Sequence, residues 1–342
     1  MPLSAKARFK LQTTIRQVIV QRQRRGWENE ARRLVMNTPW LISRWPGLHH
    51  YNDLAAKTRI KIISADDAQF DLTKRIAYGD YWARYEITKV LGKAGYFVTD
   101  QTPDVVLHLW GGPATLPKRA YKIAWLYDHP QLVTPRILRQ YDRIYCLSAQ
   151  FTEKIRRMGF PAEWLPGATS MTPVTRELLY DVVFVGNGWH KGGRPIVTNL
   201  GLPSYNLKVW GRGWGRFLPA EFIGGMYYDY PQLALLYGAA RIALNDNMPD
   251  MRREGFAGFR IYDILGSGGF CISDSNTGIY EIFGESVPQV STPEALRNSV
   301  QHYLDHPDER CELSAKGHAL VGQYRWEQVV ARLLEDITPR MA

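Results

Sequence analysis

Short apolar runs recur along the first half of the chain, and stretches with helical spacing separate them. Glycine, proline or aspartate closes most of these runs. An apolar run without alternating polar residues is typical of a strand in a parallel sheet that helices cover on both faces. The predicted strands are Arg59–Ser64, Tyr96–Val98, Val105–Leu109, Ile123–Tyr127 and Arg143–Leu147, and the predicted helices are Asp80–Gly95 and Ala149–Met158.

The alternation begins again after a connector at Leu165–Val174. Two α/β halves of similar size follow, without an internal repeat that can be aligned. Ligands bind beyond the carboxyl ends of strands in such sheets, so we expect a central cleft between two Rossmann-like domains. The second set of predicted strands is Tyr180–Val185, Leu207–Trp210, Arg241–Leu244 and Gly269–Ser273, and the helices are Pro231–Ala240, Phe256–Gly266, Pro293–Leu304, Pro307–Gly322 and Trp326–Ile337.

The chain divides into four predicted segments. They are a basic amphipathic N-terminal segment (1–57), a first Rossmann-like domain (58–170), a second one (171–325) and a C-terminal helix (326–342). A length of 342 residues agrees with two domains of about 150 residues each.

Composition narrows the class of protein. Apolar residues make up 45% and charged residues 22%, which excludes a disordered, collagen-like or coiled-coil chain. The three cysteines are too few and too scattered for a disulfide framework or a zinc site, which favours a reducing compartment. No apolar run approaches the ~18 residues of a membrane span, and the N-terminus lacks a signal-peptide pattern. We expect a soluble or peripheral cytoplasmic protein.

The positive charge is concentrated at the N-terminus. Residues 1–50 hold ten Lys and Arg and two Glu, which is +8 of the formal +10. Leu11, Ile15, Val18 and Ile19 recur at helical spacing within this segment. Three interpretations stay open: a helix packed on the main body, a helix lying on an anionic membrane surface such as that of the inner membrane, and a segment that contacts nucleic-acid phosphates.

Two predicted strands end in glycine and basic residues. Gly186-Asn187-Gly188 precedes Lys191 and Arg194, and Gly211-Arg212-Gly213 ends the next strand. Glycine lets backbone N–H groups approach a phosphate, and the basic side chains add charge. The alternatives are a structural turn and a surface arginine.

A third candidate site starts at Asn245, where an apolar strand ends. Arg260 and Asp263 lie three residues apart at the start of the following helix. A helix N-terminus suits a diphosphate, and a carboxylate one turn later can accept hydrogen bonds from the two ribose hydroxyls. The alternative is an ordinary Arg–Asp helix pair.

These residues carry a family resemblance. The region 180–326 resembles the C-terminal half of group-1-type glycosyltransferases of the GT-B fold, and it is most similar to the branch known as spore-maturation CgeB-like. The resemblance rests on Phe184-Val185-Gly186-Asn187, on Ala243-Leu244-Asn245, and on Phe259-Arg260-Ile261-Tyr262-Asp263. It extends more loosely through Leu91–Val98 and Trp125–Pro130, so that it covers about residues 58–330.

The resemblance implies that the second domain binds a nucleotide-sugar donor. Asp263 would hold the ribose, and the remaining donor-binding residues would be Gly186, Asn187, Lys191, Arg194, Arg212, Asn245 and Arg260. Retaining members of the family often carry Glu-x7-Glu. Eight positions after Glu254 stands Tyr262, which leaves open both the sugar contact of Glu254 and the stereochemistry.

The first domain is expected to supply the catalytic base. Asp128 and His129 end a buried strand, and either can take a proton from an acceptor hydroxyl; the alternative is a His-Pro turn with a capping Asp. Asp80 is a candidate sugar contact or a helix N-cap.

The predicted reaction is transfer of a sugar to a cell-envelope glycan, a lipid-linked acceptor or a protein. The alternatives are glycosylation of modified DNA bases and a non-catalytic relative that binds nucleotide or glycan. The chain contains no Asp-x-Asp, so we expect basic residues in place of a metal ion, and no cofactor besides the donor.

Overall fold

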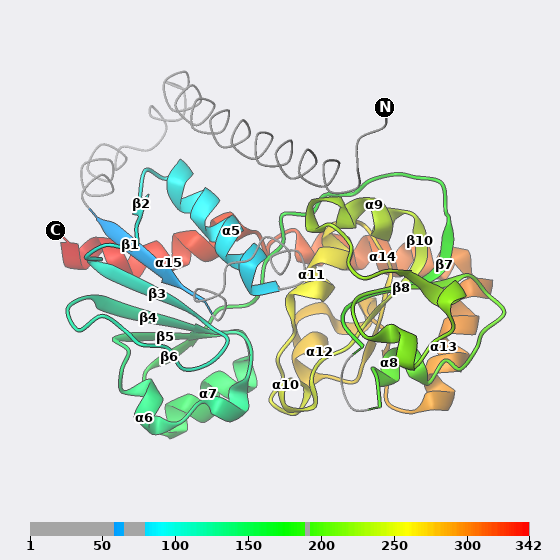
Figure 1. Ribbon diagram of the computed structural model, residues 1–342, viewed down its shortest axis with the longest axis horizontal. Coiled ribbons are helices and arrows are strands. Elements are labelled where there is room, and N and C mark those ends of the chain that lie inside the picture. The colour runs from blue at the N-terminus through cyan, green and yellow to red at the C-terminus, as the bar shows by residue number, and fades with distance from the viewer. Residues whose placement is uncertain (1–57, 65–78, 189–191, 342) are drawn as a thin grey trace, which may run out of the picture.

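The protein forms two α/β domains that lie side by side (Figure 1). The structure is a computed structural model, and it describes residues 58–64, 79–188 and 192–341. Each domain contains a six-stranded sheet in which every pairing is parallel. The predicted architecture of two Rossmann-like parallel sheets is confirmed. The basic segment 1–57 lies outside the described residues.

The first sheet has the strand order β2-β1-β3-β4-β5-β6. All six residues of β3 are buried, as expected for an apolar run in a central strand. Its strands are β1 (Arg59–Ile63), β2 (Phe97–Val98), β3 (Val105–Trp110), β4 (Tyr121–Leu126), β5 (Arg143–Cys146) and β6 (Ala162–Trp164), and its helices are α5 (Gly79–Lys93), α6 (Pro135–Leu138) and α7 (Ala149–Arg157).

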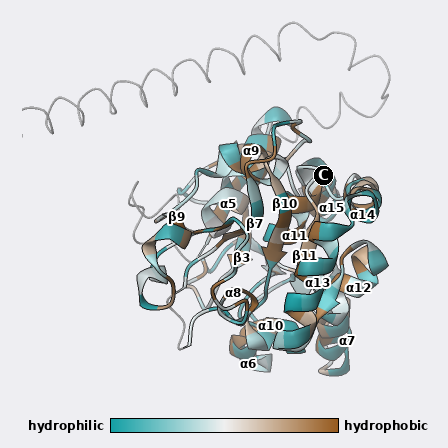
Figure 2. Cartoon of the chain, turned by 90° about the vertical axis from the view of Figure 1, so that its right-hand side faces the viewer, coloured by the Kyte–Doolittle hydropathy of each residue, from teal (hydrophilic) through white to brown (hydrophobic). Residues whose placement is uncertain are grey.

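The second sheet has the order β12-β11-β10-β7-β8-β9. Its strands are β7 (Tyr180–Val185), β8 (Leu207–Trp210), β9 (Ile223–Gly225), β10 (Ala240–Asn245), β11 (Cys271–Asp274) and β12 (Gln289–Val290). Its helices are α8 (Pro195–Thr198), α9 (Leu233–Gly238), α10 (Pro249–Arg253), α11 (Phe259–Gly266), α12 (Thr277–Phe283), α13 (Pro293–Asp305) and α14 (Pro307–Val321). Hydrophobic residues gather on the inner strands β10 and β11, whereas the outer helix α13 is mostly hydrophilic (Figure 2).

The last helix, α15 (Trp326–Met341), returns to the first domain (Figure 1). Trp326, Val330 and Leu333 belong to the hydrophobic core of that domain. Arg332 pairs with Glu163 at the edge strand β6, and Arg143 on β5 lies 2.7 Å from Asp336. The C-terminal helix therefore completes the first domain, although it follows the second in sequence.

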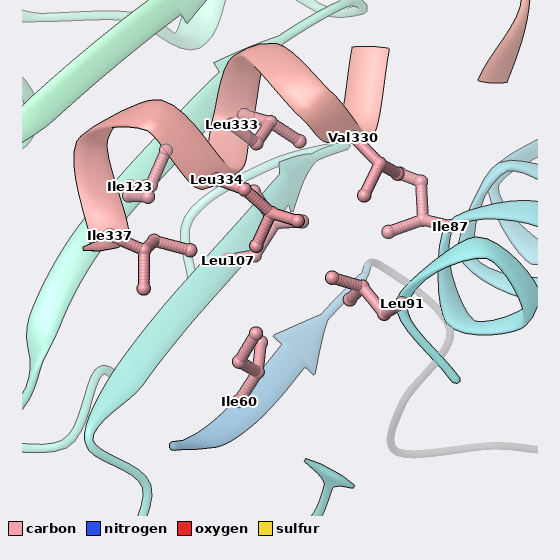
Figure 3. Close-up of a pocket in the computed structure, with 9 residues that line it drawn as sticks. All are labelled: Ile60, Ile87, Leu91, Leu107, Ile123, Val330, Leu333, Leu334 and Ile337. Carbon is pink, nitrogen blue, oxygen red and sulfur yellow. The ribbon is translucent and has the colours of Figure 1, made fainter. Parts of the chain in front are cut away.

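A small apolar cavity lies beneath α15. Side chains from α5, α15 and three strands point toward one another around it (Figure 3). Because its lining is entirely aliphatic, the cavity offers no polar partner to water. The lining residues are Ile60, Ile87, Leu91, Leu107, Ile123, Val330, Leu333, Leu334 and Ile337.

Aromatic side chains join the two domains. Phe259, the first residue of α11, packs against Trp125 and Tyr127 at the end of β4, with ring centroids 5.7 and 5.2 Å apart. Trp326 lies 5.5 Å from the same phenylalanine ring. The start of α11 is thereby fixed against the carboxyl end of the first sheet's β4.

Several short elements were not predicted. They include β6, β9, α6 and α10, each of three to five residues. Such elements are too short for a hydrophobic period, and their form depends on tertiary partners. In the described part of the chain, none of the helices combines the length and the apolar character that crossing a membrane requires.

Candidate functional site

Polar residues gather where β7, β8, β10 and β11 end. These strands are neighbours in a parallel sheet, so their carboxyl ends share one edge. Asn187 follows β7, Asn245 ends β10, and Asp274 ends β11. Three of the predicted donor-binding residues, Gly186, Asn187 and Asn245, therefore meet at this edge.

The glycines at the ends of β7 and β8 allow a close backbone approach. Gly211 has φ 145°, and a Cβ there would lie 2.0 Å from the carbonyl oxygen of Gly186. The Gly186 N–H donates to the carbonyl of Trp210 at 2.8 Å. A Cβ on Gly186 would lie 2.9 Å from Nη2 of Arg260. No side chain fits at either position without displacing its neighbours.

Arg194 and Arg260 converge on this edge from different elements. Arg194 precedes α8, and its Nε donates to the carbonyl of Asn187 at 3.0 Å. Arg260 lies in the first turn of α11, and its Nε donates to the carbonyl of Val185 at 2.8 Å. Both guanidinium groups lie over the ring of Phe184, at 5.9 and 4.8 Å. Two residues 66 positions apart in the chain thus form one basic site.

Asp246 contacts both arginines. Its Oδ1 and Oδ2 lie 3.2 and 3.1 Å from Nη1 of Arg194, and its Oδ1 lies 3.1 Å from Nη1 of Arg260. Two positive groups share one carboxylate, so this three-residue cluster keeps a net positive charge. The sequence analysis did not single out Asp246, although its position directly after Asn245 at a strand end was a usable signal.

Each arginine keeps one end of its guanidinium group open. Nε and Nη1 make all the hydrogen bonds of both side chains that are found among the described residues. The Nη2 groups of Arg194 and Arg260 thus have donors to offer, and the side chains are 13% and 20% exposed. Two fixed guanidinium groups with available N–H donors are suited to an anionic oxygen.

Three further residues belong to the predicted donor-binding set: Arg212, Asn245 and Lys191. The backbone N–H of Arg212 donates to Oδ1 of Asn187 at 2.8 Å, which places this half-buried arginine beside the same edge. Asn245 accepts from Nη1 of Arg260 at 3.3 Å and donates to Ser273 at 2.9 Å. Lys191 lies outside the described residues.

Asp274 is a second acidic residue that the sequence analysis missed. Its carboxylate accepts hydrogen bonds from the backbone N–H and from Nδ2 of Asn247, at 3.1 and 3.0 Å. Burial raises the pKa of Asp274 to about 6, against the opposing effect of these hydrogen bonds. Arg252 is its one charged partner among the described residues, with Nη1 at 3.9 Å from Oδ2. Asp274 therefore differs from Asp246, which contacts two arginines at 3.1–3.2 Å.

Asp263 lies one turn further along α11, and its carboxylate contacts hydroxyl groups instead of the basic site. Its Oδ1 accepts hydrogen bonds from Oγ1 of Thr169 at 2.7 Å and from the hydroxyl of Tyr230 at 3.2 Å. Burial raises the pKa of Asp263 to about 7, the two hydroxyl groups lower it, and the nearby charge of Glu86 raises it further. Within the described residues Asp263 makes no ion pair, so the helix pair with Arg260 is absent.

The partners of Asp263 connect the two domains. Thr169 lies in the connector, and the ring of Tyr230 stacks on Trp82 of α5 with centroids 4.6 Å apart. The next connector residue, Ser170, donates to Glu86 of α5 at 3.0 Å. The carboxylate of Asp263 is therefore held where the connector, α5 and α11 meet.

The contacts of Glu254 lie apart from the basic site. The Glu254 carboxylate lies 2.7 Å from Nζ of Lys154 on α7, and its backbone carbonyl accepts from Ser148 at 2.5 Å. Glu254 thus links the two domains in this structure. Asp80 lies in the first turn of α5, and its side chain is outside the described part.

Asp128 and His129 form a pair that follows β4 after one intervening residue, Tyr127. Asp128 Oδ1 accepts from the backbone N–H of His129 at 2.7 Å, and Oδ2 lies 3.1 Å from Nδ1 of the ring. His129 has φ 48°, a left-handed conformation that is uncommon for a residue with a side chain. The turn that follows (Pro130–Leu132) contacts α10 of the second domain. The two side chains thus lie at the carboxyl edge of the first sheet, close to the second domain.

The described residues contain no group of three or more His, Cys, Asp or Glu arranged to hold a metal ion.

The comparisons with known proteins agree with this architecture. Residues 194–335 match the family model described as "Glycosyl transferase-like". Curated proteins gave no match. Among solved structures, sucrose-phosphate synthase from Thermosynechococcus elongatus is similar with a TM-score of 0.60 at 14% identity, over 82% of this chain and 98% of that one.

Two further structures were solved with nucleotide ligands. T4 phage β-glucosyltransferase with its UDP-glucose substrate has a TM-score of 0.58 at 11% identity, over 82% of this chain and all of that one (100%). Anabaena HepE with UDP and glucose has a TM-score of 0.58 at 11% identity, over 82% and 99%. The chain therefore has the GT-B fold, and its second domain is glycosyltransferase-like in sequence.

Proposed function

We propose that this protein is a glycosyltransferase that takes a sugar from a nucleotide-sugar donor, and that its second domain binds the donor diphosphate through Arg194 and Arg260. One observation carries the proposal: both guanidinium groups are fixed through Nε and Nη1, so that their Nη2 groups are available at the carboxyl edge of a parallel sheet. The glycosyltransferase-like match over 194–335 contains both arginines. Within that family we place the chain near the CgeB-like branch.

The same two arginines would stabilise the leaving group of the reaction. Negative charge develops on the departing diphosphate, and prealigned positive groups stabilise it without the cost of reorganising solvent. Arg212 would add charge at this edge. Lys191 stays a predicted contact, since it lies outside the described residues. We propose that these groups make the reaction independent of a metal ion. Activity that persists in EDTA supports this point, and activity that requires added Mg²⁺ or Mn²⁺ contradicts it.

Asp263 is the proposed ribose contact. Its Oδ1 already has two partners, whereas Oδ2 has none among the described residues. One ribose hydroxyl would donate to Oδ2. The second would replace the hydroxyl of Tyr230, which at 3.2 Å makes the longer of the two bonds to Oδ1. Additional donors favour the ionised carboxylate, so donor binding would lower the pKa of Asp263.

The pair of Asp128 and His129 is the proposed catalytic group. Oδ2 of Asp128 lies 3.1 Å from Nδ1 of His129, although the contact lacks hydrogen-bond geometry. A negative charge at this distance favours the tautomer with the proton on Nδ1, which leaves Nε2 as the basic nitrogen of the ring. We propose that Nε2 takes the proton of the acceptor hydroxyl as the oxygen attacks the anomeric carbon. Glu254 would contact the sugar only after its ion pair with Lys154 opens, and Asp80 is retained as a candidate sugar contact.

The proposed acceptor is a cell-envelope glycan, a lipid-linked molecule or a protein, reached by a cytoplasmic enzyme whose residues 1–50 lie on the anionic inner surface of the membrane. The alternative acceptor is a modified DNA base, because a structure described as the DNA-modifying enzyme β-glucosyltransferase shares the fold, with a TM-score of 0.57. Either acceptor gives the basic segment a role.

The full-length chain separates these acceptors. The envelope proposal predicts cosedimentation with vesicles that contain anionic lipid, and weaker binding after Arg22, Arg24 and Arg25 are changed to Gln. The DNA alternative predicts salt-sensitive DNA binding that the same changes weaken. Binding to DNA without binding to vesicles would contradict the envelope proposal.

A thermal-shift screen tests the function itself. Nucleotides and nucleotide-sugars that bind the native state stabilise it, by about 2.7 kcal/mol at a ligand concentration 100 times the Kd. We expect nucleoside diphosphates and their sugars to raise the unfolding temperature, and the best donor to support turnover. Stabilisation without turnover for every donor would favour a non-catalytic binding protein. No stabilisation by any nucleotide would contradict the proposal.

A further inference from the structure

Asp246 occupies the centre of the basic site without being one of its donors. It follows β10, and its side chain is only 6% exposed. Its two carboxylate oxygens contact Nη1 of Arg194 and Nη1 of Arg260 at 3.1–3.2 Å. The two arginines reach it from the start of α8 and from α11. Asp246 is therefore the one described side chain that touches both guanidinium groups through charged contacts.

We propose that Asp246 is a positioning residue for the donor diphosphate: by engaging Nη1 of both arginines, it aims their Nη2 groups at the phosphate oxygens. This inference rests on the function proposed above. Asp246 itself would not touch the donor, because a carboxylate and a phosphate repel each other.

Electrostatics explain why two adjacent arginines need such a residue. Burial lowers the pKa of Arg194, the charge of Asp246 raises it, and the charge of Arg260 lowers it. Without the carboxylate, the two guanidinium groups would repel each other. Each would also regain the rotamer freedom of a long side chain. Asp246 thus offsets the cost of holding like charges together before the ligand arrives.

A positioning role for Asp246 predicts a change in anion affinity whose direction is opposite to the one that net charge predicts. Removing a negative charge makes the site more positive, so attraction by net charge alone predicts tighter binding of an anion. Positioning predicts the opposite, because the arginines lose the geometry that the diphosphate needs. The two explanations therefore differ in the direction of the change in affinity.

The test compares two variants of the full-length protein. Asp246→Asn keeps the shape of the side chain and removes its charge. Asp181→Asn is the control, since Asp181 lies at the start of β7, at the opposite edge of the same sheet, and pairs with Arg241 at 3.2 Å. Calorimetric titration would measure the binding of UDP, inorganic pyrophosphate and uridine to both variants and to the wild type.

We expect Asp246→Asn to weaken the binding of UDP and pyrophosphate at least tenfold while uridine affinity stays within twofold. The control Asp181→Asn should change all three affinities less than threefold. Unchanged or tighter pyrophosphate binding in Asp246→Asn would overturn the inference. Wild-type protein that binds neither UDP nor pyrophosphate would instead contradict the proposed function.

A second variant covers the case in which Asp246→Asn does not fold. Asp246→Glu keeps the charge but moves the carboxylate by one methylene, which shifts both guanidinium groups. We expect a severalfold loss of pyrophosphate affinity with the unfolding temperature close to that of the wild type. Wild-type affinity for pyrophosphate in Asp246→Glu would then overturn the inference, because positioning depends on distance and not on charge alone.

Discussion

Both domains are built on a six-stranded parallel sheet, but the two sheets differ in strand order and at the carboxyl ends of their strands. In the first domain, β3, β4 and β5 end in Trp110, Leu126 and Cys146, all of them fully buried. In the second domain, β10 and β11 end in Asn245 and Asp274, and β7 runs into Gly186. One edge is thus packed with apolar side chains, and the other is lined with polar and charged ones.

This difference shows how two similar α/β domains can have different roles in one protein. Buried charges rarely stabilise a fold, because desolvation offsets their attraction. The second domain nevertheless keeps Arg194, Arg260 and Asp246 largely out of solvent at its edge. The first domain places its polar pair, Asp128 and His129, just beyond its apolar edge, in the turn that contacts α10. We infer that the second domain binds the charged donor and that the first supplies the proton acceptor.

The largest expected effect on turnover comes from the first domain's polar pair. His129→Ala should lower kcat by about 100-fold or more, which is the usual contribution of a general base. Donor affinity should stay within threefold, because the proposed donor site lies in the other domain. Steady-state kinetics together with nucleotide titration would measure both quantities. Turnover equal to that of the wild type would remove His129 from the mechanism and weaken the division of roles.

The next effect concerns the buried carboxylate of Asp263. Its pKa is raised to about 7, so between pH 4 and 7 the folded state binds more protons than the unfolded state. The free energy of unfolding therefore falls as pH rises through this range. The loss is complete above pH 7, and it is on the order of 4 kcal/mol at most.

Asp263→Asn should flatten this pH dependence, because the amide has no proton to lose and can still accept from Thr169. Urea unfolding at pH 5 and pH 8 would compare the variant with the wild type. The same variant should weaken nucleotide binding if Asp263 contacts the ribose. A wild-type slope retained in Asp263→Asn would show that other groups, such as Asp274 with its pKa raised to about 6, dominate the dependence.

The smallest effect is expected at the ion pair that joins the domains away from the basic site. Lys154 is 47% exposed, so its pair with Glu254 is screened by solvent. Lys154→Ala should lower the free energy of unfolding by less than about 1 kcal/mol and leave nucleotide affinity unchanged. A loss above about 2 kcal/mol in urea unfolding would show that this contact, and not the aromatic packing around Phe259, holds the domains together.

Much of the fold could be predicted from the sequence. The run Val105–Leu109 matches β3 to within a residue, because a central parallel strand requires an unbroken apolar stretch. The three-residue strand β6 was missed, since it is too short to show a period. The packing of α15 on the first domain depends on tertiary contacts, and no local sequence pattern predicts it.

The candidate site was predicted as a set of residues but not as an arrangement. Arg194 and Arg260 were identified individually, and the pairing of β7 with β10 brings them to one carboxylate. Asp263 was expected beside Arg260 on one helical face, yet the two side chains have different partners. Thr169 and Tyr230 gave no local signal, because they reach Asp263 only through the fold.

The most direct test of the central claim is a titration of UDP and inorganic pyrophosphate into the wild type and Arg260→Gln. Arg297→Gln, an exposed arginine on α13, is the control. Loss of charged hydrogen bonds worth about 1.5–3 kcal/mol predicts roughly 10- to 150-fold weaker binding in Arg260→Gln and no change in the control. Equal affinity in all three proteins would contradict a diphosphate site at this edge of the second sheet.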